Sequence, residues 1–239
     1  IQFPFKRYQI QPVWRADRPQ RGRYREFFQC DVDIIGSDSL INEVDPINIF
    51  DEALSKLGLK DFTIKLNNRK ILAGLVDAIG ANSEFTAITI ALDKFDKIGP
   101  NGVKNELSKI NIGEDATNKL IDILSFEGNA QEKLEYLKPI VSGSQIGLKG
   151  IEEMEFIFNA LENINIKNAN IDLDIKLARG LNYYTGCIFE VNAGGVSIGS
   201  ICGGGRYDDL TGIFGLADVS GVGVSFGADR IYDVMEELK

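Results

Sequence analysis

The chain has 239 residues, of which 44% are hydrophobic and 26% charged, and its formal net charge is −9. This length is enough for one large domain, or for one domain that carries an insertion. No run of about 18 apolar residues occurs, and the N-terminus lacks a charged segment followed by a long apolar one, so neither a membrane-spanning helix nor a signal peptide is expected.

Histidine is absent from the sequence, and the three cysteines are Cys30, Cys187 and Cys202. Without histidine, the chain has no Ser-His-Asp triad, no Cys-His dyad and no histidine-ligated metal site of its own. An odd number of cysteines without a C-x-x-C pair favours reduced, buried thiols in a cytoplasmic protein over a disulfide framework or a zinc site. Any catalysis must therefore be electrostatic, use carboxylates, or rely on groups of the substrate itself.

The first predicted element is an antiparallel pair of strands over residues 6–14 and 26–35, whose side chains alternate between apolar and polar. The loop between the strands is basic, because residues 6–25 contain seven Lys and Arg and a single acid, Asp17. In an acidic chain such a cluster indicates a small polyanion, for example the phosphates of a nucleotide, held by the forked donors of arginine.

One face of this strand pair is polar. Period-two alternation places on it the side chains of Arg15, Phe27, Gln29, Asp31 and Asp33. A strand with acids and glutamine on one face either lines a polar pocket or faces solvent. Alternation alone leaves both interpretations open.

Two helices and a strand follow. The first helix is predicted to start at Asp45, with Asp45 as N-cap and Pro46 at the first position, and to end at Gly58. A short strand over 62–66 and a second helix over 69–79 come next.

The middle of the chain has a different character. Residues 81–164 read as helical, are rich in Lys, Glu and Asn, and are punctuated by glycines such as Gly99 and Gly113. No constellation of site residues occurs in them. The pattern predicts an inserted helical subdomain whose charge runs are solvated faces.

The last 70 residues return to strands. Residues 171–179 alternate strictly and predict a strand, and residues 186–202 predict a hairpin that turns near Gly194. Residues 203–212 predict a tight glycine-rich turn, and residues 221–238 a strand, a glycine break and an amphipathic helix. The sum is an α+β fold with a mainly antiparallel sheet.

Three stretches contain residues suited to chemistry, and the first is the basic loop. In the second, residues 177–190, Arg179 ends the predicted strand, and Tyr183 and Tyr184 follow. A tyrosine pair supplies a hydroxyl and an aromatic wall for a polar ring, or simply packs in the core at a strand end. In the third, residues 221–230, glycines let the backbone approach a ligand, but neither a P-loop nor a dinucleotide-binding fingerprint is present.

Together these stretches resemble the histidyl-tRNA synthetases, which are class II aminoacyl-tRNA synthetases. VWRADRPQRGRYREFFQCDVD (13–33) resembles the family's motif 2, and LARGLNYYTG (177–186) its histidine-specific motif. GGGRYDDL (203–210) and GVSFGADR (223–230) resemble its tyrosine-bearing turn and motif 3. The resemblance covers nearly the whole chain. It implies an antiparallel catalytic sheet flanked by helices, with catalytic parts at 1–80 and 166–239 around a helical insertion at 81–165.

The resemblance also implies an activity and a set of site residues. The family activates L-histidine with ATP to histidyl-adenylate and transfers the histidyl group to tRNA(His). Arg15 and Arg179 are implied to be catalytic, on opposite sides of the α-phosphate. The residues implied to bind ATP are Arg15, Asp17, Arg23, Phe27 and Arg230, and those implied to bind histidine are Arg15, Gln29, Asp33, Arg179, Tyr183, Tyr184 and Tyr207. ATP is a substrate, Mg²⁺ is expected on its phosphates, and no side chain is expected to ligate a metal.

Parts of the family pattern lie outside this sequence. Motif 1, the loop that supplies an acid to the substrate's amino group, and the anticodon-binding domain are absent. We therefore expect a catalytic-domain fragment of a cytoplasmic, homodimeric enzyme, which alone aminoacylates poorly or not at all. Arg18 and Arg21 are expected either to approach the acceptor end of tRNA or to be solvated loop charges.

Two other interpretations are kept. One is a non-catalytic, histidine-binding paralogue, such as the regulatory subunit of ATP phosphoribosyltransferase. The other is a pseudo-synthetase module of a larger signalling protein. The arginines at 15, 23, 179 and 230 and the long helical insertion favour the enzyme.

Overall fold

The computed structural model describes residues 2–178 and 183–239, which fall into two compact units. The sheet unit comprises Ile1–Lys65, Asn159–Asp172 and Phe189–Lys239, and the helical unit comprises Leu66–Phe158 and Leu173–Ile188. The helical unit thus differs from the expected subdomain at 81–165: it adds residues 66–80 and 173–188, and it leaves residues 159–165 to the sheet unit.

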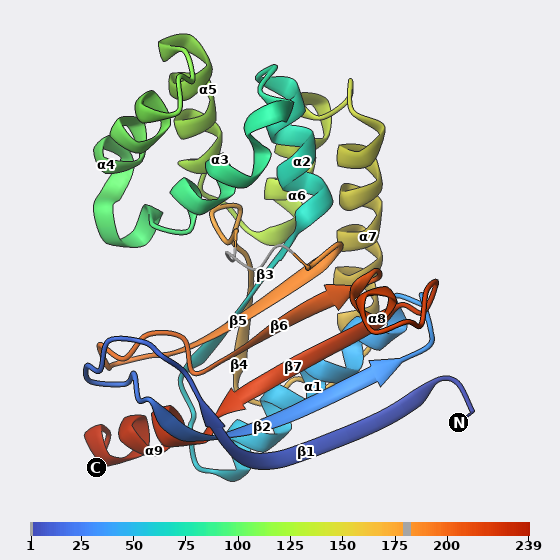
Figure 1. The fold of residues 1–239 in the computed structure, drawn as a ribbon, viewed down its shortest axis with the longest axis vertical. Helices are drawn as coiled ribbons and strands as arrows, with labels where there is room; N and C mark the ends of the chain where they lie inside the picture. Colours follow the sequence, from blue (N-terminus) through green and yellow to red (C-terminus); the bar gives the residue numbers. More distant parts are fainter. Residues whose placement is uncertain (1, 179–182) are drawn as a thin grey trace. The chain divides into compact units, whose positions relative to one another are not determined.

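The described strands form one sheet in the order β1-β2-β7-β6-β5-β3-β4. The pairs β1 with β2, β2 with β7, and β6 with β7 are antiparallel, so the predicted α+β class is confirmed. In Figure 1, β1 lies at one margin of the sheet beside β2. The strand bounds are Phe5–Trp14 (β1), Glu26–Ile35 (β2), Phe62–Asn68 (β3), Ala169–Leu173 (β4), Cys187–Ala193 (β5), Cys202–Tyr207 (β6) and Gly221–Gly227 (β7).

The core of the sheet unit lies under helix α1, Ile41–Lys56, which packs against β6 and β7. Phe50 of α1 is completely buried, and its ring centroid lies 6.4 Å from that of Phe189 and 5.1 Å from that of Phe226. Truncating such a side chain to alanine typically costs about 3–5 kcal/mol. These aromatic contacts are therefore a large part of what holds α1 to the sheet.

The predicted start of this helix at Asp45 is wrong. The helix begins one turn earlier, at Ile41, and Pro46 lies inside it. Pro46 removes the backbone hydrogen bond to the carbonyl of residue 42, which a prediction from sequence counts against helix. The extra turn is held by the buried carboxylate of Glu43, whose Oε2 accepts from Arg206 Nη2 at 2.7 Å. That partner is remote in sequence and invisible to local patterns.

The predicted end of α1 is confirmed. Gly58 has a positive φ of 89°, and the N–H of Leu59 donates to the carbonyl of Leu54 at 3.1 Å, which closes the last turn. Asp51, in the same helix, is buried and accepts from the backbone N–H groups of residues 167–169 at 2.6–3.0 Å. These hydrogen bonds hold the start of β4 to the helix.

The helical unit contains five complete α-helices and the greater part of α7 among its described residues. The bounds are Arg69–Ala78 (α2), Asn82–Glu84 (η1, a 3₁₀ turn), Phe85–Leu92 (α3), Phe95–Lys109 (α4), Glu114–Leu124 (α5), Ala130–Ile140 (α6) and Gln145–Leu161 (α7). Most charged side chains of residues 81–164 are solvated as expected, but Lys133 and Glu153 are buried. No described helix of the chain is long and apolar enough to cross a membrane.

The predicted strand over 171–179 is also wrong in its second half. β4 ends at Leu173, and Asp174 begins a turn in which its Oδ1 accepts from the N–H of Lys176 at 3.0 Å. The carbonyl of Asp174 then accepts from the N–H of Leu177 at 3.0 Å. Ile175 and Leu177 are buried in this turn. The alternation of apolar and polar residues here therefore reflects burial of side chains and not a strand.

The prediction of a tight turn at 203–212 is wrong: residues 203–207 belong to strand β6, and the short helix α8, Leu210–Ile213, begins three residues later. The glycines serve close strand packing: a Cβ on Gly204 would lie 2.1 Å from the carbonyl oxygen of Gly223. The strand–break–helix prediction for the C-terminal segment is confirmed by β7 and by α9, Ala228–Glu237.

Candidate active site

Asp33 and Tyr207 meet on one face of the sheet. Asp33 lies near the end of β2, Tyr207 is the last residue of β6, and β7 runs between these strands. The Tyr207 hydroxyl donates to Asp33 Oδ1 at 2.7 Å, and Arg7 Nη1 from β1 lies 3.3 Å from Asp33 Oδ2. The carboxylate therefore has a phenol on one oxygen and a guanidinium near the other.

Glycines on β7 make room for this contact. Gly223 is opposite Asp33 in the ladder, and Gly221 is opposite Tyr207. A Cβ on Gly223 would lie 2.1 Å from Asp33 Oδ1, and one on Gly221 would lie 2.4 Å from the Tyr207 ring. Both side chains lean over β7, which only a strand without side chains at these positions permits.

The environment of Asp33 changes its proton affinity. Burial raises the pKa of the Asp33 carboxyl above its ordinary value, while the hydrogen bond from Tyr207 and the charge of Arg7 oppose that rise. Since the pKa remains raised, the desolvation outweighs the two partners. A partly desolvated acceptor forms a stronger hydrogen bond with a ligand N–H than a solvated one does.

Gln29 lies on the same face and is fixed by hydrogen bonds. Its Nε2 donates to Asp31 Oδ1 at 2.6 Å and to Ser225 Oγ at 2.9 Å. Ser225 Oγ in turn donates to Asp31 Oδ1 at 2.5 Å. The side-chain oxygen of Gln29 accepts from Arg15 Nη2 at 3.1 Å, so the network extends to the base of the basic loop.

Arg15 also covers the ring of Phe27, with its guanidinium carbon 4.9 Å from the ring centroid. This is a cation–π geometry between a charge and an aromatic face. Of the other residues expected to bind ATP, Asp17 and Arg23 form an exposed ion pair at 3.8 Å within the loop. An exposed pair at that distance holds the loop only weakly.

The basic loop is latched to helix α9. Arg230 donates through Nη1 to the carbonyl of Ser200 at 2.6 Å and through Nε to the carbonyl of Gly22. The Tyr24 hydroxyl donates to Asp233 at 2.6 Å, and the side chain of Arg21 pairs with Glu237. Arg21, expected to approach the acceptor end of tRNA or to be a solvated loop charge, pairs with Glu237 and keeps its side chain exposed.

The remaining predicted residues belong to the helical unit. The rings of Tyr183 and Tyr184 lie 4.6 Å apart between centroids, and Tyr184 is buried while Tyr183 is exposed. Arg179 lies outside the described residues. The roles assigned to these three side chains stay predictions.

Comparison with known protein families shows to which family the chain belongs. The model of the family described as histidyl-tRNA synthetase matches residues 3–231. The chain belongs to the histidyl-tRNA synthetase family. It is 60% identical over 239 residues to the histidine–tRNA ligase of Christiangramia forsetii, a match that covers all of this chain and 52% of that protein. The chain therefore spans about half the length of the curated relatives it matches.

Solved structures agree with this membership. The crystal structure of histidyl-tRNA synthetase from Nostoc sp. PCC 7120 matches with a TM-score of 0.88 and 33% identity, over 100% of this chain and 56% of that one. A protein described as an ATP phosphoribosyltransferase regulatory subunit/histidyl-tRNA synthetase, from Bacillus halodurans C, matches with a TM-score of 0.81 and 22% identity, over 97% and 59%. The second likeness shows the fold alone.

Sequence reasoning within the histidyl-tRNA synthetase pattern missed Arg7 and the acids of α9. Aligning the two predicted strands about a loop centred on Gln20 places Arg7 opposite Asp33, as the observed register does. The acids of α9 recur every four residues, at Asp229, Asp233 and Glu237, which marks one helical face. Both signals were present in the sequence.

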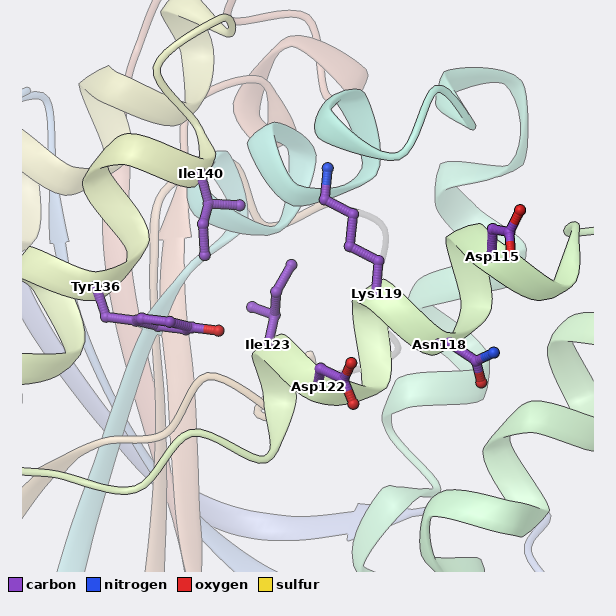
Figure 2. A pocket seen from close by; sticks show the side chains of 7 residues that line it. All are labelled: Asp115, Asn118, Lys119, Asp122, Ile123, Tyr136 and Ile140. Atoms are coloured by element: carbon purple, nitrogen blue, oxygen red, sulfur yellow. The ribbon is translucent and has the colours of Figure 1, made fainter.

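Two pockets are lined by other side chains than the predicted site residues. The first lies on the reverse face of β2, and the second lies in the helical unit. One, of about 460 Å³, is lined mainly by apolar side chains, among them Ile10, Val32, Ile49 of α1 and Ile231 of α9. Figure 2 shows the other, of about 500 Å³, where residues of α5 and α6 face each other in the helical unit. It contains none of the predicted site residues; its lining is Asp115, Asn118, Lys119, Asp122, Ile123, Tyr136 and Ile140.

Proposed function

We propose that this chain is the catalytic core of a histidine–tRNA ligase, which activates L-histidine with ATP and passes the histidyl group to tRNA(His). The observation that carries the proposal is the Asp33–Tyr207 contact beside the fixed Gln29, in a chain whose relatives are histidine–tRNA ligases. An imidazole has two ring nitrogens, and a selective pocket needs a partner for each. A carboxylate and a phenol meet that need.

The proposed reaction balances without a base from the protein. A carboxylate oxygen of histidine attacks the α-phosphorus of ATP, the new O–P bond forms, and pyrophosphate leaves with the electron pair of the broken bond. The terminal ribose hydroxyl of tRNA(His) then attacks the activated carbonyl, its proton passes to a phosphate oxygen of the adenylate, and AMP leaves with the electron pair of the broken C–O bond. The chain's own work is to orient the reactants and to neutralise the charge that develops.

Arg15 is assigned to the α-phosphate and the substrate carboxylate. Its forked donors suit two oxygens at once, and it lies next to Gln29 and over Phe27. The positive charge proposed to bind a phosphate, on Arg15, thus lies next to the aromatic ring proposed to stack on adenine, that of Phe27. The family resemblance assigns ATP contacts to Asp17, Arg23, Phe27 and Arg230, and histidine contacts to Gln29, Asp33, Tyr183, Tyr184 and Tyr207.

Further parts of the proposal rest on the resemblance alone. Arg179 is assigned to the α-phosphate and to histidine, opposite Arg15. Mg²⁺ enters on the phosphates of ATP, as part of the substrate; no group of three acidic or cysteine side chains suited to a metal occurs among residues 2–178 and 183–239. The full-length protein is proposed to be a homodimer and to act in the cytoplasm.

Isothermal titration of the 239-residue chain with histidine and with ATP, separately and together, tests the proposal. We expect both to bind, and we expect Asp33→Asn to weaken histidine binding about 10- to 100-fold, because it removes a charged acceptor. ATP affinity should be unchanged. Asp38→Asn, an exposed aspartate on the loop after β2, is the control.

A chain that binds neither ligand would leave the proposal without support. The regulatory-paralogue alternative makes a different prediction, namely histidine binding that is indifferent to ATP and no histidine-dependent exchange of pyrophosphate into ATP. Retention of the arginines at 15, 23, 179 and 230 favours the ligase.

A further inference from the structure

Three consecutive polar residues are buried where β3 joins α2: Asn67, Asn68 and Arg69. Burying an amide or a guanidinium is costly unless it is hydrogen-bonded, so a run of three demands a structural reason. None of them belongs to the site assigned above. Asn67 and Arg69 donate to backbone carbonyls within residues 175–186, the stretch of the helical unit that contains the histidine-specific motif.

Asn67 holds the chain just before that motif. Its Nδ2 donates to the carbonyl of Ile175 at 3.1 Å and to the carbonyl of Leu177 at 2.8 Å. Its Oδ1 accepts from the N–H of Asn68 at 2.8 Å. Both N–H groups of the Asn67 amide therefore donate to one short segment, the turn that follows β4.

Arg69 holds both ends of the motif. Its guanidinium Nη1 donates to the carbonyl of Ala178 at 3.2 Å, and its backbone N–H donates to the carbonyl of Gly186 at 2.9 Å. The guanidinium carbon also lies 4.8 Å from the centroid of the Phe85 ring. Burial lowers the pKa of Arg69. Among the described residues it has no carboxylate partner, so the carbonyl and the ring are what keep it in place.

The base of this arrangement is rigid. Asn68 caps α2, its Oδ1 accepting from the N–H of Lys70 at 2.9 Å, and its Nδ2 donates to Glu153 Oε2 at 2.8 Å. The other oxygen of the buried Glu153 pairs with Lys70 Nζ. Cap, strand end and helix α7 are thus joined through one satisfied polar network, which fixes the side chains that reach the motif.

We propose that Asn67 and Arg69 are positioning residues for the histidine-specific motif, residues 177–186. By fixing the chain at Leu177 and Ala178 and again at Gly186, they set the placement of Tyr183 and Tyr184. The inference rests on the proposed function, in which these side chains contact histidine. A displacement of about 1 Å in such groups can cost about 100-fold in rate, so anchoring the two ends directly serves the chemistry.

The test compares variants of the 239-residue chain by titration with histidine. Asn67→Asp keeps the shape but replaces two donors with acceptors, and Arg69→Met keeps the length and the backbone N–H. Both are expected to raise the dissociation constant for histidine about 10- to 100-fold, with close to one site per chain. Arg69→Lys, which retains a donor, should recover part of the affinity. Lys119→Met is the matched control, because it removes a cation that donates to a backbone carbonyl elsewhere, that of Ala78.

Hydrogen exchange supplies a readout independent of binding. In Arg69→Met the amides of residues 173–178 and 183–188 should exchange faster than in the parent, whereas those of α5 should not change. Parental affinity in both Asn67→Asp and Arg69→Met would overturn the inference. So would fewer sites per chain at an unchanged dissociation constant, which marks a purely structural role. Failure of the parent chain to bind histidine would instead overturn the proposed function, and this inference with it.

Discussion

At the scale of single residues, Asp33 combines a binding role with a cost in stability. Its pKa is raised in the folded chain, mainly by burial. A raised pKa means that the folded state binds the proton more tightly than the unfolded state does. The free energy of unfolding then falls as the pH rises through the interval that starts at the ordinary value of 3.8 and ends at the raised one. At neutral pH the carboxylate is a net burden on the fold.

Asp33→Asn is therefore expected to increase the free energy of unfolding at pH 7, while it weakens histidine binding. The amide keeps an acceptor for Tyr207 and has no charge to desolvate. The increase should shrink as the pH falls and vanish below pH 3.8, where both forms are neutral. Urea unfolding from pH 3 to pH 7 measures it. Loss of stability at pH 7 would show instead that Tyr207 and Arg7 outweigh the burial.

At the scale of elements, helix α1 is tied to the sheet unit by polar anchors as well as by its apolar face. The carboxylate of Glu43, in the first turn of the helix, accepts two hydrogen bonds from the guanidinium of Arg206. Arg206 also donates to the carbonyls of Ser37 at 3.0 Å and Ser39 at 3.3 Å. Asp51 accepts from the backbone N–H groups of residues 167–169, where β4 begins. Removing one partner of such a buried contact leaves the others unsatisfied, which costs far more than the contact itself contributes.

Asp51→Asn should destabilise the chain by about 3 kcal/mol, because one carboxylate oxygen becomes an amide that faces a backbone donor. Glu52→Gln is the control on the same helix. It breaks only the exposed pair of Glu52 with Lys56 and should leave the unfolding midpoint nearly unchanged. Chemical denaturation of the two variants beside the parent gives the comparison, and equal midpoints for all three would contradict the anchoring role of Asp51.

At the scale of the whole molecule, local signals predicted most elements, and long-range contacts account for the failures. Alternation located β1 and β2, and Gly58 marked the end of α1. The start of α1 was missed because Glu43 pairs with a residue 163 positions away. The glycines of β6 led to the prediction of a turn, but they are needed for close packing against β7 and not for a local bend. Of the site, the Asp33–Tyr207 contact was foreseeable only through the family resemblance, since it joins residues 174 positions apart.

The 239-residue chain spans 52% of the length of the histidine–tRNA ligase of Christiangramia forsetii. The two steps of the proposed reaction can be measured separately on this chain. We expect it to bind histidine and yet to aminoacylate tRNA(His) poorly or not at all. Histidine-dependent exchange of pyrophosphate into ATP, measured beside transfer to tRNA, separates the two steps. Robust exchange and transfer by the chain alone would contradict the expectation.

The partners of β2 lie at opposite ends of the chain. β1 precedes β2 directly, but Asp31 reaches Ser225 across 194 positions. On a ribosome, the β1–β2 pair emerges early and exposes an unpaired edge until β7 has been made, which is a hazard for nascent chains. Pairing of β2 is thus complete only when β7 has been added, and a chain arrested before residue 221 would lack the strand that lies between Asp33 and Tyr207.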